Sequence, residues 1–408
     1  MQMKIKLRIT PFLLLCFSGG LAIFSSTMAK NPALPLFIRS LGVPVSTVGF
    51  IAAASTIVGI VVSLPAGMLS DIIGRRRVLL VAAVVFATAP FLYLLVTAPW
   101  HLVVVRIYHG LATAILGPVA LAAVADTYSS GRGERIAWYS SATMIGRFLA
   151  PFAGGLLIFG DNFRFIYIAD GVAGILALLA ISRLRFTEKT SKKVKEVFSQ
   201  LCSKYRQEMV FILRHRGILA TSGIEAVQYF AFGCMETYLP IYLNEKLGYP
   251  AWQIGILFAV QILSATFTKP IMGSLSDRYG RIPLIGVGLL VGGIATSAML
   301  LWANYVVVIA LMTLFGLGLA TVTASTSALV ADLARAEGRG GAMGVLSCIM
   351  DIGQSSGPMV AGILIGAISY HVTFALVGLL MAISAVLFVV LMRYRFAYGG
   401  TKESINGL

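Results

Sequence analysis

Long apolar runs alternate with short charged breaks along the whole chain. Runs of about 20 residues, the length that spans ~30 Å of hydrocarbon at 1.5 Å per residue, recur from end to end. These lengths, and the absence of ten-residue apolar alternation, favour helices over β-strands. We therefore predict an all-α membrane protein with twelve transmembrane helices, at residues 10–29, 46–69, 78–97, 101–125, 136–159, 165–182, 217–243, 251–274, 282–302, 305–331, 341–365 and 372–392.

Composition supports a membrane protein and excludes an ordinary soluble one. The 408 residues are 58% hydrophobic and 12% charged, about half the charged share of a typical globular chain. The net charge of +16 would suggest a nucleic-acid binder if the chain were soluble. Its distribution along the chain decides against that interpretation.

Lysine and arginine are concentrated in alternate breaks. Of the 32 Lys and Arg residues, 25 lie in segments 1–9, 70–77, 126–135, 183–216, 275–281, 332–340 and 393–408, and the intervening breaks hold Lys30, Arg39, Arg164 and Lys246. Cytoplasmic loops carry such an excess. We expect a multi-pass protein of the inner (cytoplasmic) membrane, with both termini in the cytoplasm, surrounded by lipid and without a nucleic-acid partner.

The N-terminal apolar run has a second interpretation, as a secretory signal. Lys4, Lys6 and Arg8 precede an apolar stretch that ends in small residues. Removing it would leave eleven spans, whereas twelve give two equal sets of six. The four cysteines, Cys16, Cys202, Cys234 and Cys348, show neither a disulfide framework nor metal-ligand spacing, and no nucleotide-binding motif is present. We expect no metal, no cofactor and no enzymatic activity.

The chain contains an internal duplication. The motif Gly-x-Leu-Ser-Asp-x-x-Gly-Arg occurs at residues 67–75 and again at 273–281, 206 residues later, each time in a short charged break. Asp126 answers Asp332 at the same offset of 206 residues, and Gly146 with Pro151 answers Gly353 with Pro358 at an offset of 207 residues. We predict two similar halves, at residues 1–184 and 216–408.

Residues 185–215 join these halves as a cytoplasmic linker. Val194, Val197, Phe198, Leu201 and Tyr205 recur at helical spacing among lysines, which indicates an amphipathic helix on the membrane surface. A solvated helix is the alternative.

Two six-helix halves, a basic central loop and the duplicated loop motif resemble the major facilitator superfamily of secondary transporters, and most of all its twelve-helix drug/proton antiporter branch. The resemblance covers nearly the whole chain. It implies alternating access and a cytoplasmic gate at the loop motifs that latches the outward-open state. Fixing topology is the alternative role for these residues: Gly67, Asp71, Gly74, Arg75 and Asp126 in the first half, and Gly273, Asp277, Gly280, Arg281 and Asp332 in the second.

The gate motif also has a physical logic. We expect its four glycines to provide close approach and unusual dihedral angles in a tight hairpin. The arginines can reach carboxylates at the same membrane face, so we predict that Arg75 pairs with Asp126 and Arg281 with Asp332.

A helix-bend motif lies in the fifth and eleventh spans. Gly146, Ala150 and Gly154 fall on one helical face, which permits close helix packing, and Pro151 interrupts the hydrogen-bond ladder. The pattern is similar to the antiporter signature of drug exporters, although Ala150 stands where that signature has glycine and Arg147 adds a charge. Simple packing is the alternative role of the predicted motif: Gly146, Pro151, Gly154, Gly155, Gly357 and Pro358.

Charged residues inside the spans are candidates for proton coupling. Glu225 and Asp351 fall near mid-membrane, and we predict that they carry protons. Arg106, in an element similar to the family's Arg-x-x-Gln-Gly with His109 in place of Gln, is expected to face the cavity and assist coupling, unless it reaches the outer interface instead. Asp170 and Glu236 lie closer to the outer face, where structural or vestibular roles are open, and Lys269 lies near the inner end of its span.

Aromatic and polar residues near Glu225 predict a cavity for an amphipathic substrate. Rings offer stacking and cation–π surfaces beside carboxylates, although packing and lipid contact are alternatives. The predicted cavity residues are Glu225, Tyr229, Glu236, Tyr238, Arg147, Gln261 and Gln354.

The sequence thus predicts a proton-coupled transporter, in particular an antiporter that exports a lipophilic or cationic compound. Two alternatives stay open. Arg106 and Arg147 suit an importer or facilitator of a small polar or anionic metabolite, and a membrane protein that senses a ligand or lipid would move nothing. We expect a small-molecule substrate and protons as partners, and a monomer.

Overall fold

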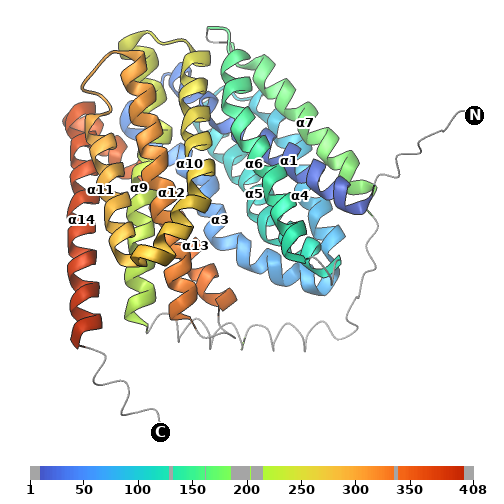
Figure 1. Ribbon diagram of the computed structural model, residues 1–408. Coiled ribbons are helices and arrows are strands. Elements are labelled where there is room, and N and C mark those ends of the chain that lie inside the picture. Colours follow the sequence, from blue (N-terminus) through green and yellow to red (C-terminus); the bar gives the residue numbers. More distant parts are fainter. Residues whose placement is uncertain are drawn as a thin grey trace, which may run out of the picture.

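The computed structural model describes residues 10–127, 132–160, 162–184, 203, 215–334 and 339–398, and these residues are organised as helices (Figure 1). Most of the predicted linker helix at residues 194–209 lies outside this described part. The helices are α1 Pro11–Lys30, α2 Ala33–Ser40, α3 Val45–Ile73, α4 Arg75–Tyr93, α5 Pro99–Thr127, α6 Arg132–Leu156, α7 Arg164–Ser182, α9 Arg216–Leu247, α10 Ala251–Tyr279, α11 Arg281–Ala298, α12 Tyr305–Leu333, α13 Arg339–Ala367 and α14 Tyr370–Tyr398.

Each predicted span corresponds to a long helix, with one addition. Within the described residues, 11 candidate spans are long and apolar enough to cross a membrane. The predicted span that is not among these 11 is the fifth, residues 136–159, which corresponds to α6, a 25-residue helix that packs between α1 and α10 and is less apolar than the others. The short helix α2, which follows α1 after Asn31 and Pro32, was not predicted because its eight residues are far shorter than the run of about 20 that marks a membrane span.

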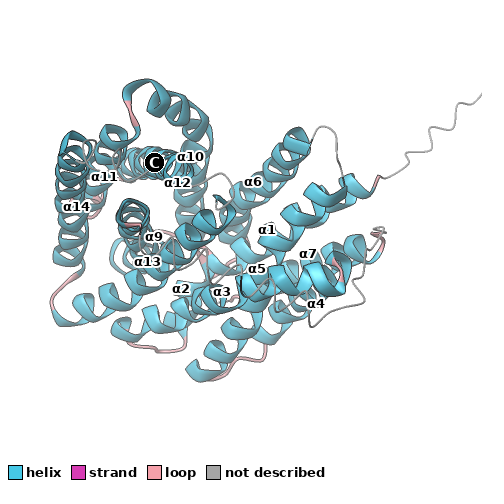
Figure 2. Ribbon diagram, turned by 90° about the horizontal axis from the view of Figure 1, so that it is seen from below, coloured by secondary structure: helices cyan, strands magenta, loops and turns pink. Residues whose placement is uncertain are grey.

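The two halves repeat one packing scheme. In the N-terminal half α1 packs against α6, α3 against α5, and α4 against both α5 and α7. The C-terminal half has the equivalent contacts, of α9 with α13, α10 with α12, and α11 with α12 and α14. Figure 2 shows α11, α12 and α14 grouped on one side and α1, α4 and α7 on the other. The fold is therefore two pseudo-symmetric six-helix bundles.

The bundles meet through α3 against α13 and α6 against α10. In both contacts a glycine of one helix lies directly against the backbone of the facing helix. A Cβ at Gly49 would stand 2.0 Å from the Pro358 carbonyl oxygen, and one at Gly155 would stand 2.5 Å from the Ala251 carbonyl oxygen. These contacts lie far from the two loop motifs, toward the top of Figure 1, and the helices of the two bundles spread apart toward the bottom. We call the bottom the motif end and the top the closed end.

Candidate transport site

Charged side chains from both bundles gather around Tyr229, in the middle of α9. The Tyr229 ring lies within electrostatic range of Glu225, Arg147, Asp351 and Glu236. These groups come from α6, α9 and α13. Four residues that were predicted separately from the sequence therefore share one region between the bundles.

Glu225 is the buried carboxylate of this region. Its side chain is 4% exposed and accepts a hydrogen bond from the Thr326 hydroxyl of α12. Lys269 of α10 lies within electrostatic range of both Glu225 and Arg147. Lys269 and Arg147 are exposed, so a cation from each bundle reaches the open space beside a sheltered acid.

Glu236 lies about three turns beyond Glu225 in α9, and its contacts join the two bundles. Its Oε2 forms an ion pair with Lys30 Nζ at 2.7 Å, and its Oε1 accepts a hydrogen bond from Asn31 Nδ2 at 3.0 Å. Gln354 Nε2 of α13 donates to Oε2 at 3.3 Å. Glu236 is 9% exposed, which places it inside a polar network rather than in an open vestibule.

Asp351 faces the opposite bundle from α13. A Cβ at Gly59 of α3 would stand 3.7 Å from its Oδ2, and Lys30 lies within electrostatic range. Asp351 is half-buried. It therefore lies at the edge of the α3 and α13 contact, one turn from Gln354.

Two predicted cavity residues lie in packed positions. Tyr238 is 0% exposed and its hydroxyl accepts from the Gly49 backbone N–H at 3.0 Å and donates to the Pro358 carbonyl at 2.9 Å, so it holds α3 against α13. Gln261 is 2% exposed in α10. In this conformation neither side chain presents a large surface to a ligand.

Arg106 lies inside the N-terminal bundle rather than in open space. It is 3% exposed, and its guanidinium donates to the Ala52 carbonyl of α3 at 2.9 Å and to the Ser55 hydroxyl. In this conformation Arg106 therefore does not reach the outer interface, which was the alternative position. Asp170, which the sequence placed near the outer face, is also fully buried in this bundle.

The two loop motifs have matching geometry at the motif end. Arg75 forms ion pairs with Asp71 and, at 3.0 Å, with Asp126. Arg281 pairs with Asp277 at 2.5 Å and with Asp332 at 3.1 Å. The predicted partners of both arginines are therefore present, and each set lies within its own bundle.

The glycines of these motifs divide into two kinds. Gly74 and Gly280 have φ of 101° and 93°, in the region that favours glycine, and they separate consecutive helices. The expectation of close approach is wrong for Gly67 and Gly273 in this conformation. Both lie inside helices, and a Cβ at either would meet nothing within 4 Å.

The helix-bend motif packs α6 on α1 and α13 on α9. A Cβ at Gly146 would stand 2.3 Å from the Gly20 carbonyl oxygen, and one at Gly154 3.1 Å from the Met28 side chain. A Cβ at Gly357 would stand 2.2 Å from the Phe230 carbonyl oxygen. Pro151 and Pro358 lie within continuous helices. The close helix packing that was expected at this motif is therefore present in the structure.

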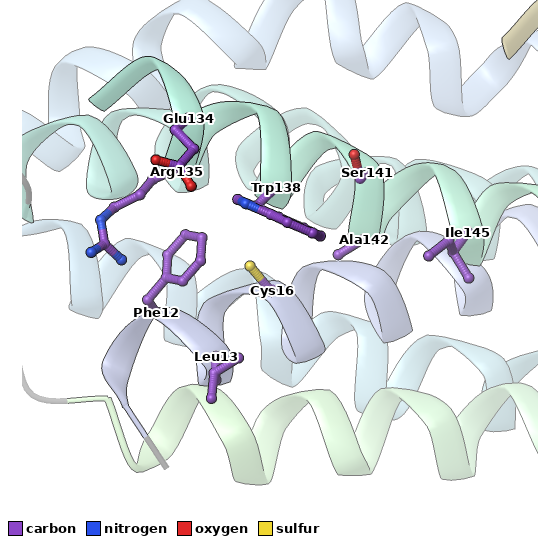
Figure 3. A pocket seen from close by; sticks show the side chains of 9 residues that line it. All are labelled: Phe12, Leu13, Cys16, Glu134, Arg135, Trp138, Ser141, Ala142 and Ile145. Atoms are coloured by element: carbon purple, nitrogen blue, oxygen red, sulfur yellow. The ribbon is translucent and has the colours of Figure 1, made fainter. Parts of the chain in front are cut away.

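A groove of about 470 Å³ lies apart from these residues, between α1 and α6. Figure 3 shows Trp138 of α6 standing over Cys16 of α1, with the charged Glu134 and Arg135 at one end. No sequence motif marks this groove, because its lining comes from one face of each of two helices. Its walls are Phe12, Leu13, Cys16, Glu134, Arg135, Trp138, Ser141, Ala142 and Ile145.

Three residues of the site escaped the sequence analysis as candidates. Lys30 is one of the four Lys and Arg residues in the less basic breaks, and Asn31 and Thr326 are uncharged residues outside every motif. Each matters through a partner more than 100 residues away. A lysine at the end of an apolar run, opposite a glutamate in another run, is the signal that could have suggested the ion pair between Lys30 and Glu236.

Comparison with known proteins agrees with this architecture. Multidrug resistance protein 2 of Bacillus subtilis is 24% identical over 360 residues, with 86% of this chain and 88% of that protein covered. Quinolone resistance protein NorA of Staphylococcus aureus is 23% identical, with 82% of this chain and 84% of that protein covered. A crystal structure of a bacterial homologue of the human lysosomal transporter Spinster, in an inward-facing and unoccupied conformation, superposes with a TM-score of 0.80 at 16% identity, covering 94% of this chain and 96% of that one. Residues 15–259 and 221–406 match the family model of the Major Facilitator Superfamily, and the chain therefore belongs to this family of secondary transporters.

Proposed function

We propose that the protein is a proton-coupled antiporter that exports lipophilic or cationic compounds by alternating access. The observation that carries this proposal is the group of charges around Tyr229. It combines the sheltered carboxyl of Glu225 with Asp351 and Glu236 between the two bundles. A carboxyl group in such a place can bind either a proton or a cation, so the two compete for it.

The conformation agrees with transport in two steps. If the basic motif end faces the cytoplasm, as the distribution of lysine and arginine predicts, the bundles are closed on the outside and spread apart on the inside. The termini then lie in the cytoplasm, and the location is the inner membrane. In the opposite conformation the loop motifs of Arg75 and Arg281 would come together as a gate.

The names of two related proteins support lipophilic or cationic compounds as the class of substrate. Multidrug resistance protein 2 and quinolone resistance protein NorA both align over most of this chain. Aromatic rings add to this support, because Tyr229 and Phe232 meet edge to face with centroids 5.9 Å apart beside Glu225. Rings and carboxylates together suit a compound that is both apolar and cationic.

The bundles are proposed to move as two domains, residues 1–184 and 216–408, joined by the linker 185–215. Glu225 and Asp351 would exchange protons in one domain, and Arg106 would assist from the other. One copy of the chain supplies all of these residues, which is the basis for proposing a monomer.

Two exposed cations favour a second candidate function. Arg147 and Lys269 reach the space between the bundles from opposite sides, and such a pair can hold a carboxylate or phosphate. A small anion would then be the cargo of an importer or facilitator. A sensor that binds a ligand without moving it is the third candidate, and a transport assay separates it from the other two.

The decisive experiment is flux in proteoliposomes under an imposed pH gradient. The antiporter should accumulate a lipophilic cation only with the gradient, and Glu225→Gln should abolish this accumulation. Accumulation that ignores the gradient would exclude proton coupling. Gradient-driven flux of small anions but not of cations would support the importer, and absence of any flux would support the sensor.

A further inference from the structure

A buried polar cluster lies inside the N-terminal bundle, away from the charges around Tyr229. Its residues come from four helices and each is at most 3% exposed. Tyr93 and Tyr167 stack at 4.5 Å between ring centroids, almost parallel, and the His109 ring stands edge-on to Tyr93 at 6.0 Å. We call it the N-half polar cluster: Ser25, Tyr93, Arg106, His109, Tyr167 and Asp170.

Many polar atoms of this cluster lack a well-formed hydrogen bond. Among the described residues, no hydrogen-bond partner is present for Asp170 Oδ1 and Oδ2, Tyr167 Oη, His109 Nε2, Arg106 Nε and Ser25 Oγ. A buried polar atom without a partner destabilises the fold by about 1–3 kcal/mol, and more when it is charged. Six such atoms lie together in this cluster, so this arrangement of the bundle is costly for the fold.

Among the residues that the structure describes, Asp170 forms no ion pair with a cation. Its carboxyl group interacts with the Ser25 hydroxyl of α1, without a well-formed hydrogen bond between them. Arg106 is the cation of the cluster, and its guanidinium is engaged by Ala52 and Ser55 of α3. An ionised carboxylate buried without a cation is strongly unfavourable, and a protonated carboxyl group is not.

Arg106 and Asp170 nevertheless act on the same pair of rings. Both lie within electrostatic range of Tyr93 and of Tyr167, and Arg106 also interacts with the Tyr93 side chain. The stacked tyrosines therefore lie beside both charged groups. A guanidinium released from α3 would find Asp170 as its available anion within the cluster.

We propose that the N-half polar cluster is a proton-binding site. Asp170 holds a proton while Arg106 is bound to α3, and gives it up when Arg106 leaves α3 and pairs with the carboxylate. The proton leaves from an Asp170 carboxyl oxygen to water, and the ion pair with Arg106 replaces it. No group is oxidised or reduced.

Contacts of α3 link this site to the opposite bundle. The residues that bind Arg106 lie in α3, the helix that packs against α13 and carries Gly59 opposite Asp351. When the bundles separate, α3 loses its contacts with α13, and its segment around Ala52 and Ser55 shifts against α5 within the N-terminal bundle. The protonation of Asp170 thereby follows the opening and closing of the bundles.

Other groups that face Asp170 are poorer proton carriers in this range. Tyr93 and Tyr167 ionise only in strongly alkaline solution. His109 packs between Phe86 and Tyr93 and lies within electrostatic range of Arg106, so a second positive charge there is opposed. From α1, Ser25 does not titrate. Asp170 is therefore the group that exchanges the proton.

This inference rests on the proposed proton coupling and adds a site in the other bundle. Infrared spectroscopy tests it on the full chain in lipid nanodiscs without requiring transport. At neutral pH the wild type should show a C=O stretching band of a protonated carboxyl that Asp170→Asn lacks, and the band should disappear in alkaline buffer. A band that persists at every pH means a permanently protonated structural residue and overturns the exchange. A band that is never present overturns the proposal.

Spin-label distances between the motif ends of α3 and α10 give a second readout. The ratio of the two conformations should depend on pH in the wild type, and this dependence should shrink in Asp170→Asn. Asp170→Glu keeps a carboxyl group and should retain both the band, at a shifted position, and the pH response. If Asp170→Asn does not fold, Asp170→Glu alone decides, because an unshifted band would assign it to another residue and overturn the proposal.

Two further variants sharpen the assignment. Gln228→Leu removes another buried polar group without partners, in the C-terminal bundle, and should leave the band and the pH response unchanged. His109→Gln should keep the band, and its loss there would transfer the proton to histidine and overturn the role of Asp170. Failure of the proposed function would look different, since gradient-independent flux can coexist with an exchanging Asp170 band.

Discussion

Lys30 and Glu236 form an ion pair across the two bundles, with Nζ and Oε2 2.7 Å apart. Asn31 and Gln354 bind the same carboxylate, so groups from both bundles depend on one charge. The pair lies toward the closed end and is partly sheltered, with the Glu236 side chain 11% exposed. Separation of the bundles therefore removes Lys30 and Asn31 from the Glu236 carboxylate.

Glu236→Gln is expected to favour opening of the closed end. Hydrogen bonds to charged groups contribute about 1.5–3 kcal/mol each, so losing the charge should shift the conformational equilibrium by roughly tenfold or more. Spin labels at the closed ends of α3 and α13 would measure the shift. Glu245→Gln is the matched control, because its pair with Arg39 also joins the bundles but is more exposed and such pairs are weak. Equal effects of the two variants would contradict a special role for Glu236.

Thr326 is expected to matter through its hydroxyl. Thr326→Val leaves the Glu225 carboxyl without its hydrogen-bond donor at nearly unchanged volume, which should lower stability by about 1–3 kcal/mol. Thermal unfolding in detergent would show a lower midpoint. Thr326→Ser keeps the hydroxyl and should stay close to the wild type. If valine and serine behave alike, the bond to Glu225 does not contribute to stability.

The fold followed from the sequence because each membrane helix needs its own apolar run, which can be read locally. The duplication also made it possible to predict that Arg75 pairs with Asp126 and Arg281 with Asp332, since the arginine and the aspartate both recur 206 residues later. Lys30, Asn31 and Thr326 could not be found in this way. Their partners lie in other helices, and which face each helix turns toward its neighbours depends on packing.

The position of a residue along its span predicts its depth in the membrane but not which helices surround its side chain. Counting residues placed Glu225 and Asp351 near mid-membrane, and both lie near Tyr229. The same count could not distinguish burial inside one bundle from exposure between the bundles. Arg106 and Tyr238 were expected at the cavity, whereas each is used to hold α3 in place in this conformation.

Arg75→Lys is expected to weaken the motif end. The Arg75 guanidinium binds Asp71, Asp126 and Ser70 together, and a lysine ammonium cannot reproduce that fork. Arg281→Lys should have a similar effect because its contacts are equivalent. Because the paired carboxylates are exposed, the expected loss is only about 0.5–1 kcal/mol of stability, measured by thermal unfolding. Arg278→Lys is the control, since Arg278 contacts the Tyr279 ring, and an equally large loss there would point to a general effect of replacing arginine by lysine at the motif end.

Gly155→Ala should obstruct closure of α6 against α10. The added Cβ would stand 2.5 Å from the Ala251 carbonyl oxygen and 2.8 Å from the Trp252 Cα, and backbone atoms cannot move aside as a flexible side chain can. Opening of the closed end relieves this clash, so the variant should populate the outward-open form and transport slowly. Accessibility of a cysteine placed at the closed end of α3 to a membrane-impermeant thiol reagent would report the change. Gly117→Ala adds the same methyl group where nothing lies within 4 Å and should leave labelling unchanged. Equal labelling of the two variants would show that the α6 and α10 contact does not control closure.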